Sequence, residues 1–294
     1  MRLFEPGIEA APVGPLRRVM LLVAYDGGSF HGFAAQPGQR TVGGTLAAIL
    51  SSMAGHEVSL TCAGRTDTGV HAHRQVVHAD VDEAVVAKWA GHEPEAGMLL
   101  ERLPRALCRQ FGSSAAVLEA RVAPDGFDAR HSATARRYRY DLLRTAWPDP
   151  LLGHVSWHVP EEPDLSAMRI GADALLGEHD FAAFCRRPPG EPVPINRRVL
   201  SSTWAPAAGD ERLWRFRIEA NAFCHQMVRT IVGTLVAVGQ GRVRAGELLA
   251  ILRSADRSRS SQPAPPRGLC LVGVSYPATL VPGGSWEPGG SGWA

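Results

Sequence analysis

The sequence of 294 residues contains a single lysine, Lys88, although Lys and Arg together number 31. Nearly all of its cations are therefore arginines. Arginine binds phosphate through paired N–H groups and stacks on bases, which suits RNA. A GC-rich genome produces the same bias without any functional meaning, so composition alone leaves both explanations open. The net charge of +2 is too small to indicate a polyanionic partner by itself.

The sequence also lacks an apolar run long enough to cross a bilayer, and its N-terminus lacks a basic-then-apolar leader. We therefore expect a cytoplasmic protein without membrane contact. No Cys-x-x-Cys pair occurs, so we expect reduced, mostly buried thiols rather than a disulfide framework or a zinc site. The five cysteines are Cys62, Cys108, Cys185, Cys224 and Cys270.

What is present is a soluble, globular composition, with 45% hydrophobic and 20% charged residues. The first half predicts a strand, a helix, two strands, a helix and a strand, which is the ferredoxin-like order. We place these elements at residues 18–25, 41–53, 58–62, 75–81, 82–110 and 115–122. Thr41 is the predicted N-cap of the first helix, and the second is interrupted near residues 91–94.

The second half predicts the same order again, although we find no sequence repeat between the halves. Its strands are predicted at 136–143, 199–204, 214–220 and 269–276, and its helices at 164–176, 223–238 and 247–252. We therefore predict an α+β fold with domains at 18–122 and 123–277. Residues 278–294, rich in Gly, Pro and Ser, are predicted to be a flexible tail.

The most informative segment is residues 63–72, Ala-Gly-Arg-Thr-Asp-Thr-Gly-Val-His-Ala, which lies between two predicted strands. An aspartate in such a loop most often only makes an Asx-turn. This segment, however, resembles the nucleophile loop of the TruA-type tRNA pseudouridine synthases, whose hallmark is Gly-Arg-Thr-Asp-x-Gly-Val-His. Further similar stretches are 25–33, 127–140, 177–181, 220–229 and 268–271, so the resemblance runs from about residue 19 to 277.

The resemblance implies two ferredoxin-like halves whose antiparallel sheets join, with helices on one side and the active-site cleft between the halves. It implies a homodimer that isomerises uridine to pseudouridine at nucleotides 38, 39 and 40 of the tRNA anticodon stem-loop. This isomerisation conserves atoms and oxidation state, so we expect no cofactor and no metal. The sequence departs from the family pattern at Phe33, Ala34, Ala35 and Gly43.

The resemblance also implies catalytic roles for individual residues. Asp67 is the expected nucleophile, since a carboxylate can form a covalent intermediate. Arg229 is expected to pair with Asp67 and keep it ionised, and Arg65 to extract the target base from its stack. Tyr138 is expected to stack on the uracil and assist proton transfer, and Leu271 to wall the base pocket.

RNA contacts are expected from arginines, although each alone also fits a solvated surface charge. We expect Arg130 and Arg137 to bind substrate. Further candidates for phosphate contacts are Arg74, Arg136, Arg186, Arg187, Arg197 and Arg198.

Three histidines, His71, His73 and His78, lie close to Asp67 in the sequence. Because no cysteine or second acid completes a ligand set, we do not expect a metal there. Two other functions remain open. One is the same chemistry on another RNA or on a free uridine nucleotide, and the other is an inactive RNA-binding or chaperone protein.

Overall fold

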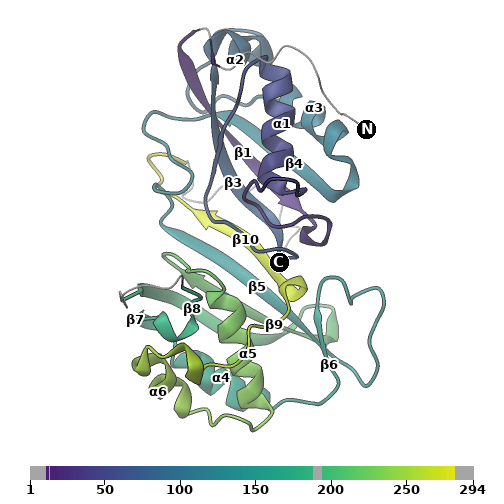
Figure 1. Ribbon diagram of the computed structural model, residues 1–294, viewed down its shortest axis with the longest axis vertical. Coiled ribbons are helices and arrows are strands. Elements are labelled where there is room, and N and C mark those ends of the chain that lie inside the picture. Colours follow the sequence, from purple (N-terminus) through teal and green to yellow (C-terminus); the bar gives the residue numbers. More distant parts are fainter. Residues whose placement is uncertain (1–10, 13, 188–193, 282–294) are drawn as a thin grey trace. The chain divides into compact units, whose positions relative to one another are not determined.

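The structure is a computed structural model that describes residues 11–12, 14–187 and 194–281. The chain folds as two compact units (Figure 1): residues 1–133 with 273–294, and residues 134–272. Of the predicted flexible tail, residues 282–294 lie outside the described residues. No helix in the described part of the chain has the length and apolar character needed to span a bilayer.

The sheet of the first unit has the order β4-β1-β3, and β2 pairs with the other side of β3. All of these pairs are antiparallel. The central strand, β1, is buried from Val19 to Val23, as its apolar run predicts. The strands are β1 (Leu16–Tyr25), β2 (Leu60–Cys62), β3 (His71–Asp82) and β4 (Ala115–Val122).

Three α-helices belong to the described part of this unit: α1 (Val42–Ala54), α2 (Glu83–Ala90) and α3 (Arg102–Phe111). The predicted N-cap of α1 is confirmed, because Thr41 Oγ1 accepts a hydrogen bond from Gly44 N at 3.1 Å. α1 packs against α3, and α3 packs against β4. The β-α-β-β-α-β order predicted for the first half is thus confirmed, with its second helix divided in two.

The sheet of the second unit has the order β5-β9-β8-β7, all antiparallel, and the short β6 lies parallel to β5. α4 packs against α5 and against β8. These elements are β5 (Ala135–Arg144), β6 (Trp157–Val159), α4 (Leu165–Asp173), β7 (Gly177–Asp180), β8 (Asn196–Ala207), β9 (Asp210–Ala220), α5 (Met227–Gly239) and α6 (Glu247–Ser254). β10 (Leu269–Ser275) begins in this unit and ends in the first.

Alternation along β5 places successive side chains on opposite faces of the sheet. Tyr138, Tyr140 and Leu142 are buried on one face, opposite buried residues of β9. Arg137 and Arg139 alternate with them and are only half-buried. The fold is therefore α+β with mostly antiparallel strands, as predicted.

Two predicted helices have different limits. α5 begins at Met227 rather than at residue 223, because Gln226 adopts a left-handed conformation with φ of 63° that a continuous helix excludes. α4 ends at Asp173 rather than at residue 176, because β7 already begins at Gly177.

The prediction that all five cysteines are free thiols is wrong. Cys185 and Cys224 form a disulfide, with their Cα atoms 5.8 Å apart. The non-helical turn before α5 carries Cys224 toward the end of the 3₁₀ helix η3 (Ala182–Phe184), where Arg186 N donates to His225 O at 2.9 Å. Cys62, Cys108 and Cys270 are free.

Candidate active site

The candidate nucleophile loop connects β2 and β3 and is held from beneath by side chains of β1 and β3. Tyr25 Oη lies 2.8 Å from Thr66 Oγ1, and Gln75 Nε2 donates to Gly64 O at 2.6 Å. Thr66 is buried, whereas Asp67 is half-buried and Arg65 is exposed. The loop thus presents Asp67 at the surface of the first unit on a fixed main chain.

Glycines let neighbouring backbone approach this loop closely. Gly32 has φ of +84°, and a Cβ there would come 3.0 Å from Thr66 O. A Cβ at Gly27 would overlap the carbonyl oxygen of Val70. Small residues around the carboxylate therefore serve the packing of the loop itself.

Two departures from the family pattern fit one another in the structure. Phe33 is buried, and its N–H donates to Thr66 O at 3.1 Å, directly before Asp67. Gly43 N donates to Phe33 O at 2.8 Å, and a Cβ at Gly43 would come 2.7 Å from that oxygen. Phe33 and Gly43 together therefore support the loop from the side of α1.

Two of the three histidines, His71 and His78, contact different parts of the first unit. His71 Nδ1 lies 3.2 Å from Gly27 N, which donates to it, and 3.1 Å from Asp26 Oδ1. His78 Nδ1 accepts from Ala129 N at 2.9 Å. Within the described ranges, no three His, Cys, Asp or Glu side chains are grouped to hold a metal.

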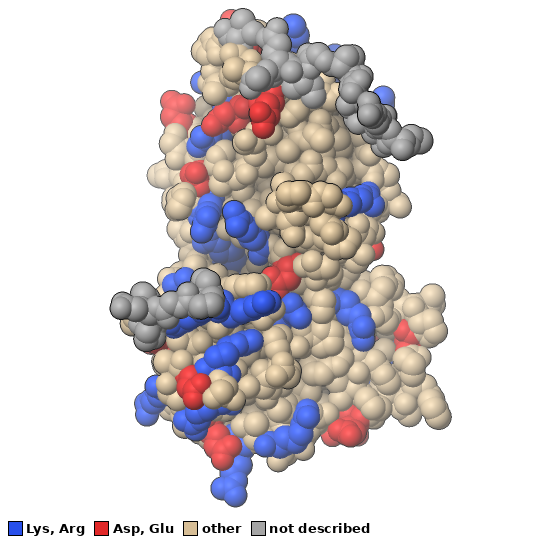
Figure 2. All heavy atoms as spheres, viewed as in Figure 1, with Lys and Arg blue, Asp and Glu red and all other residues tan. Residues whose placement is uncertain are grey.

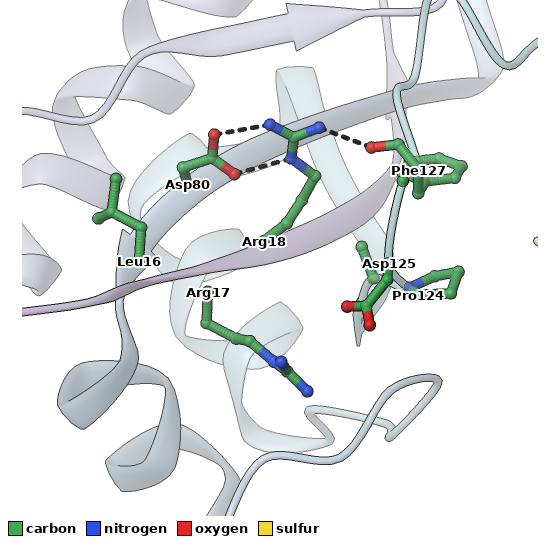
Figure 3. Close-up of a pocket in the computed structure, with 9 residues that line it drawn as sticks. Leu16, Arg17, Arg18, Asp80, Pro124, Asp125 and Phe127 are labelled. Carbon is green, nitrogen blue, oxygen red and sulfur yellow. Dashed lines mark hydrogen bonds and ion pairs between the residues drawn. The ribbon is translucent and has the colours of Figure 1, made fainter.

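A second loop, residues 127–131, carries Arg130 and is fixed through its main chain. Arg18 Nη1 donates to Phe127 O at 2.6 Å (Figure 3), and Tyr276 Oη donates to Ala129 O at 2.8 Å. With the bond from Ala129 N to His78, three side chains hold this loop. Arg130, which follows Ala129, is exposed.

Charges around this loop shift several pKa values. Burial, followed by the Arg18 charge, lowers the pKa of His78, so its ring is held neutral as an acceptor. The hydrogen bonds from Arg18 lower the pKa of Asp80. Burial raises the pKa of Asp128, but the N–H groups of His131 and Arg130 outweigh it and the net shift is downward. A pocket of about 390 Å³ opens beside Arg18 and Asp80.

In the second unit, two tyrosines on one face of β5 have different surroundings. Tyr140 is fully buried, and its hydroxyl donates to Pro265 O at 2.8 Å. Tyr138 is 7% exposed, and Phe223 packs edge-on against it, with ring centroids 5.1 Å apart. Tyr140 is thus a structural residue, and Tyr138 remains the candidate for contact with a base.

Arg229 lies in the first turn of α5, where its side chain is oriented by the segment before β10. Its Nε donates to Ala264 O, and Ala264 N donates to Arg229 O, each at 2.8 Å. A Cβ at Gly233 would overlap the oxygen of Gln262, so this segment lies directly on the helix. Leu271 is fully buried in β10.

The predicted site residues therefore divide between the units. Asp67, Arg65 and Arg130 lie in the first, and Tyr138, Arg137, Arg229 and Leu271 lie in the second. Sequence reasoning did not single out the supports of these residues, Tyr25 and Gln75 above all. For Tyr25, the signal was present in the Tyr-Asp-Gly stretch at residues 25–27.

Comparison with known proteins adds the family. The profile described as tRNA pseudouridine synthase matches residues 172–277. A protein named tRNA pseudouridine synthase A from Leifsonia xyli subsp. xyli is 40% identical over 270 residues, 88% of this chain and 92% of its own. A protein of the same name from Streptomyces griseus subsp. griseus is 40% identical, over 90% of this chain and 89% of its own. Another, from Methylobacterium sp. (strain 4-46), is 40% identical, over 88% of this chain and 98% of its own.

Among solved structures, the crystal structure of a Cbf5-Nop10-Gar1 complex matches 74% of this chain and 44% of its own at 12% identity and a TM-score of 0.30. That likeness is too weak to carry an argument. The relatives at 40% identity, by contrast, extend over almost nine tenths of the chain or more. The chain therefore belongs to the tRNA pseudouridine synthase family.

Proposed function

We propose that this protein converts uridine to pseudouridine in tRNA, at nucleotides 38, 39 and 40 of the anticodon stem-loop. The observation that carries the proposal is the loop 63–72, which matches the family hallmark and presents a half-buried Asp67 on a braced main chain. The names of the relatives support the same substrate and reaction.

The reaction breaks the bond between ribose C1′ and uracil N1, turns the base, and forms a bond between C1′ and C5. The proton on C5 leaves and N1 gains one, so atoms and oxidation state balance. Asp67 is the proposed nucleophile, because an ionised carboxylate can bond covalently to one fragment while the base turns. Arg65, which is exposed beside it, is proposed to displace the target base from its stack.

The second unit supplies the remaining proposed roles. Tyr138 stacks on the uracil and takes part in the proton transfer, and Leu271 contributes an apolar wall. Arg229, oriented through its Nε by Ala264 O, is proposed to keep the nucleophile ionised. Arg130 and Arg137 are proposed to contact the RNA.

The decisive experiment is Asp67→Asn, with Asp125→Asn as a control that makes the same change at an exposed position of the same unit. Unmodified tRNA transcripts are incubated with each variant, and pseudouridine is mapped by nucleotide. We expect Asp67→Asn to bind tRNA but form no product, because an amide is a far poorer nucleophile. Turnover within about tenfold of the parent would remove Asp67 from the covalent role.

The same assay separates the other functions. Product on uridine monophosphate but not on tRNA would indicate the free nucleotide as substrate. RNA binding without product in the parent protein would indicate an inactive RNA-binding protein. The homodimer is proposed on the family resemblance, and analytical ultracentrifugation measures it. The cytoplasmic location is proposed from the sequence.

A further inference from the structure

Beside the start of α5, one arginine is fixed in place by a hydroxyl group. Arg257 begins the 3₁₀ helix η4 (Arg257–Arg259), and its Nη1 donates to Thr230 Oγ1 at 2.7 Å. Thr230 donates its own hydroxyl to Gln226 O at 3.0 Å, so the guanidinium is fixed to the first turn of α5. Arg257 is half-buried, yet its described partner is a neutral hydroxyl that leaves the positive charge uncompensated.

A second arginine, Arg186, is brought to the same place by the main chain. Its N–H donates to His225 O at 2.9 Å, and the preceding Cys185 is bonded to Cys224. η3, which precedes Cys185, packs against η4. Burial, followed by the charge of Arg186, lowers the pKa of Arg257, in agreement with this packing.

The acid nearest in sequence does not neutralise this pair. Asp256 Oδ1 accepts from Ser258 N at 2.9 Å and from Ser258 Oγ at 2.8 Å, and it caps η4. Within the described ranges, no ion pair joins Arg186 or Arg257 to a carboxylate. Figure 2 shows basic side chains gathered over the second unit, where α5 and α6 lie, with few acidic ones among them.

Another arginine of the same unit shows the opposite arrangement. Arg212 forms ion pairs with Asp210 at 2.8 Å and with Asp149 at 3.0 Å, so its charge is already matched. Holding two like charges together costs free energy unless an anion joins them. Arg186 and Arg257, but not Arg212, therefore have the chemistry of an anion site.

We propose that Arg186 and Arg257 form a subsite that binds a backbone phosphate of the anticodon stem-loop. This inference rests on the proposed function, which supplies RNA as the anion. Arg257 is anchored to Thr230, the neighbour of Arg229 in α5, so the phosphate belongs to a nucleotide close to the target uridine. Paired N–H donors of guanidinium suit phosphate oxygens.

The test compares Arg186→Ala and Arg257→Ala with Arg212→Ala, which removes the same charge from a paired site. Binding of the isolated anticodon stem-loop is measured by fluorescence anisotropy at several salt concentrations. We expect each subsite variant to weaken binding and to reduce the slope of log K against log salt by about 0.7 to 1. Arg212→Ala should keep the parental slope. Slopes in both subsite variants equal to that of Arg212→Ala would overturn the proposal.

Arg257→Gln guards against a folding defect, because its amide can still donate to Thr230 while the charge is lost. We expect it to unfold at the parental temperature and to show the reduced salt slope. If it keeps the parental slope, the charge is not used. Pseudouridine formation by the parent protein is measured in parallel. Product in the parent with unchanged slopes in the variants rejects the subsite alone, whereas no product in the parent rejects the proposed function.

Discussion

The hydroxyl of Tyr25 lies 2.8 Å from Oγ1 of Thr66, the residue immediately before Asp67. Gln75 Nε2 lies 3.4 Å from the same Tyr25 hydroxyl and 2.6 Å from Gly64 O. The buried amide of Gln75, on β3, therefore links that strand to Tyr25 of β1 and to the loop. The position of Asp67 thus depends on a polar contact beneath the surface as well as on the loop sequence.

Tyr25→Phe tests this support. The ring and its contact with Phe33, at 6.3 Å between centroids, are kept, but the hydroxyl is lost. A lost hydrogen bond is worth about 0.5–1.5 kcal/mol, so we expect the single-turnover rate to fall by up to roughly tenfold with tRNA affinity unchanged. A parental rate would show that the loop holds its conformation without Tyr25.

Tyr138→Phe and Tyr140→Phe form a matched pair on one strand. Tyr138→Phe should slow the chemical step by about 10²–10⁴-fold while stability and RNA binding change little, because only a proton-transfer group is lost. Tyr140→Phe should lower stability and leave the chemical step unchanged. It leaves Pro265 O without its donor and costs about 1 kcal/mol of unfolding free energy, at an unchanged rate per folded molecule.

Single-turnover rates at saturating enzyme and urea unfolding of both variants check this pair. If Tyr138→Phe reacts at the parental rate, Tyr138 is a stacking platform only, and the proton leaves through another group. If Tyr140→Phe loses rate without losing stability, the two roles are exchanged.

Much of the fold could be predicted because its signals are local. A continuous apolar run indicated β1, alternation indicated β5, and the Thr41 cap indicated the start of α1. The supports of the candidate site could not be predicted in this way, since Tyr25 and Thr66 are 41 residues apart and meet only in the folded sheet. Gln226 misled the prediction of α5, because a left-handed residue other than glycine leaves no compositional mark.

The departures from the family pattern show the same limit. In the sequence, Phe33 and Gly43 are separate exceptions, whereas in the structure the absent side chain of Gly43 gives room to Phe33 O. The residue roles come from a long motif rather than from composition, so they stay predictions until variants are measured.

The disulfide gives a third prediction. With no reductant present, denatured protein should show three reactive thiols, from Cys62, Cys108 and Cys270, and five after reduction. Closing a loop of 39 residues constrains the unfolded chain by roughly 3–4 kcal/mol, so reduction should lower the melting temperature. Cys62→Ser, which removes a free thiol, is the control for the count. Five thiols before reduction would show that the bond does not form in solution.

His78 gives the last prediction, on pH. Its Nδ1 accepts from Ala129 N and needs a neutral ring, and burial lowers its pKa below the ordinary value of about 6.5. In the unfolded chain His78 binds a proton more readily, so native stability should fall as the pH drops below about 6.5. Asp80 and Asp128 have pKa values below their ordinary range and stay ionised there. Their contribution is lost only in stronger acid.

His78→Asn isolates this effect, because its side-chain oxygen can replace Nδ1 as acceptor and does not titrate. Urea unfolding at pH 7.5 and pH 5.5 measures the loss of stability in parent and variant. The contributions of all other histidines are the same in both proteins and cancel when the two losses are subtracted. We expect the parent to lose more stability than His78→Asn on acidification. In the parent, acidification should also reduce the slope of log K for tRNA binding against log salt. Protonated His78 no longer accepts from Ala129 N, so the loop that carries Arg130 loses one of its hydrogen bonds. Equal losses in both proteins would mean that His78 is not held neutral, and that the loop 127–131 depends on Arg18 and Tyr276 alone.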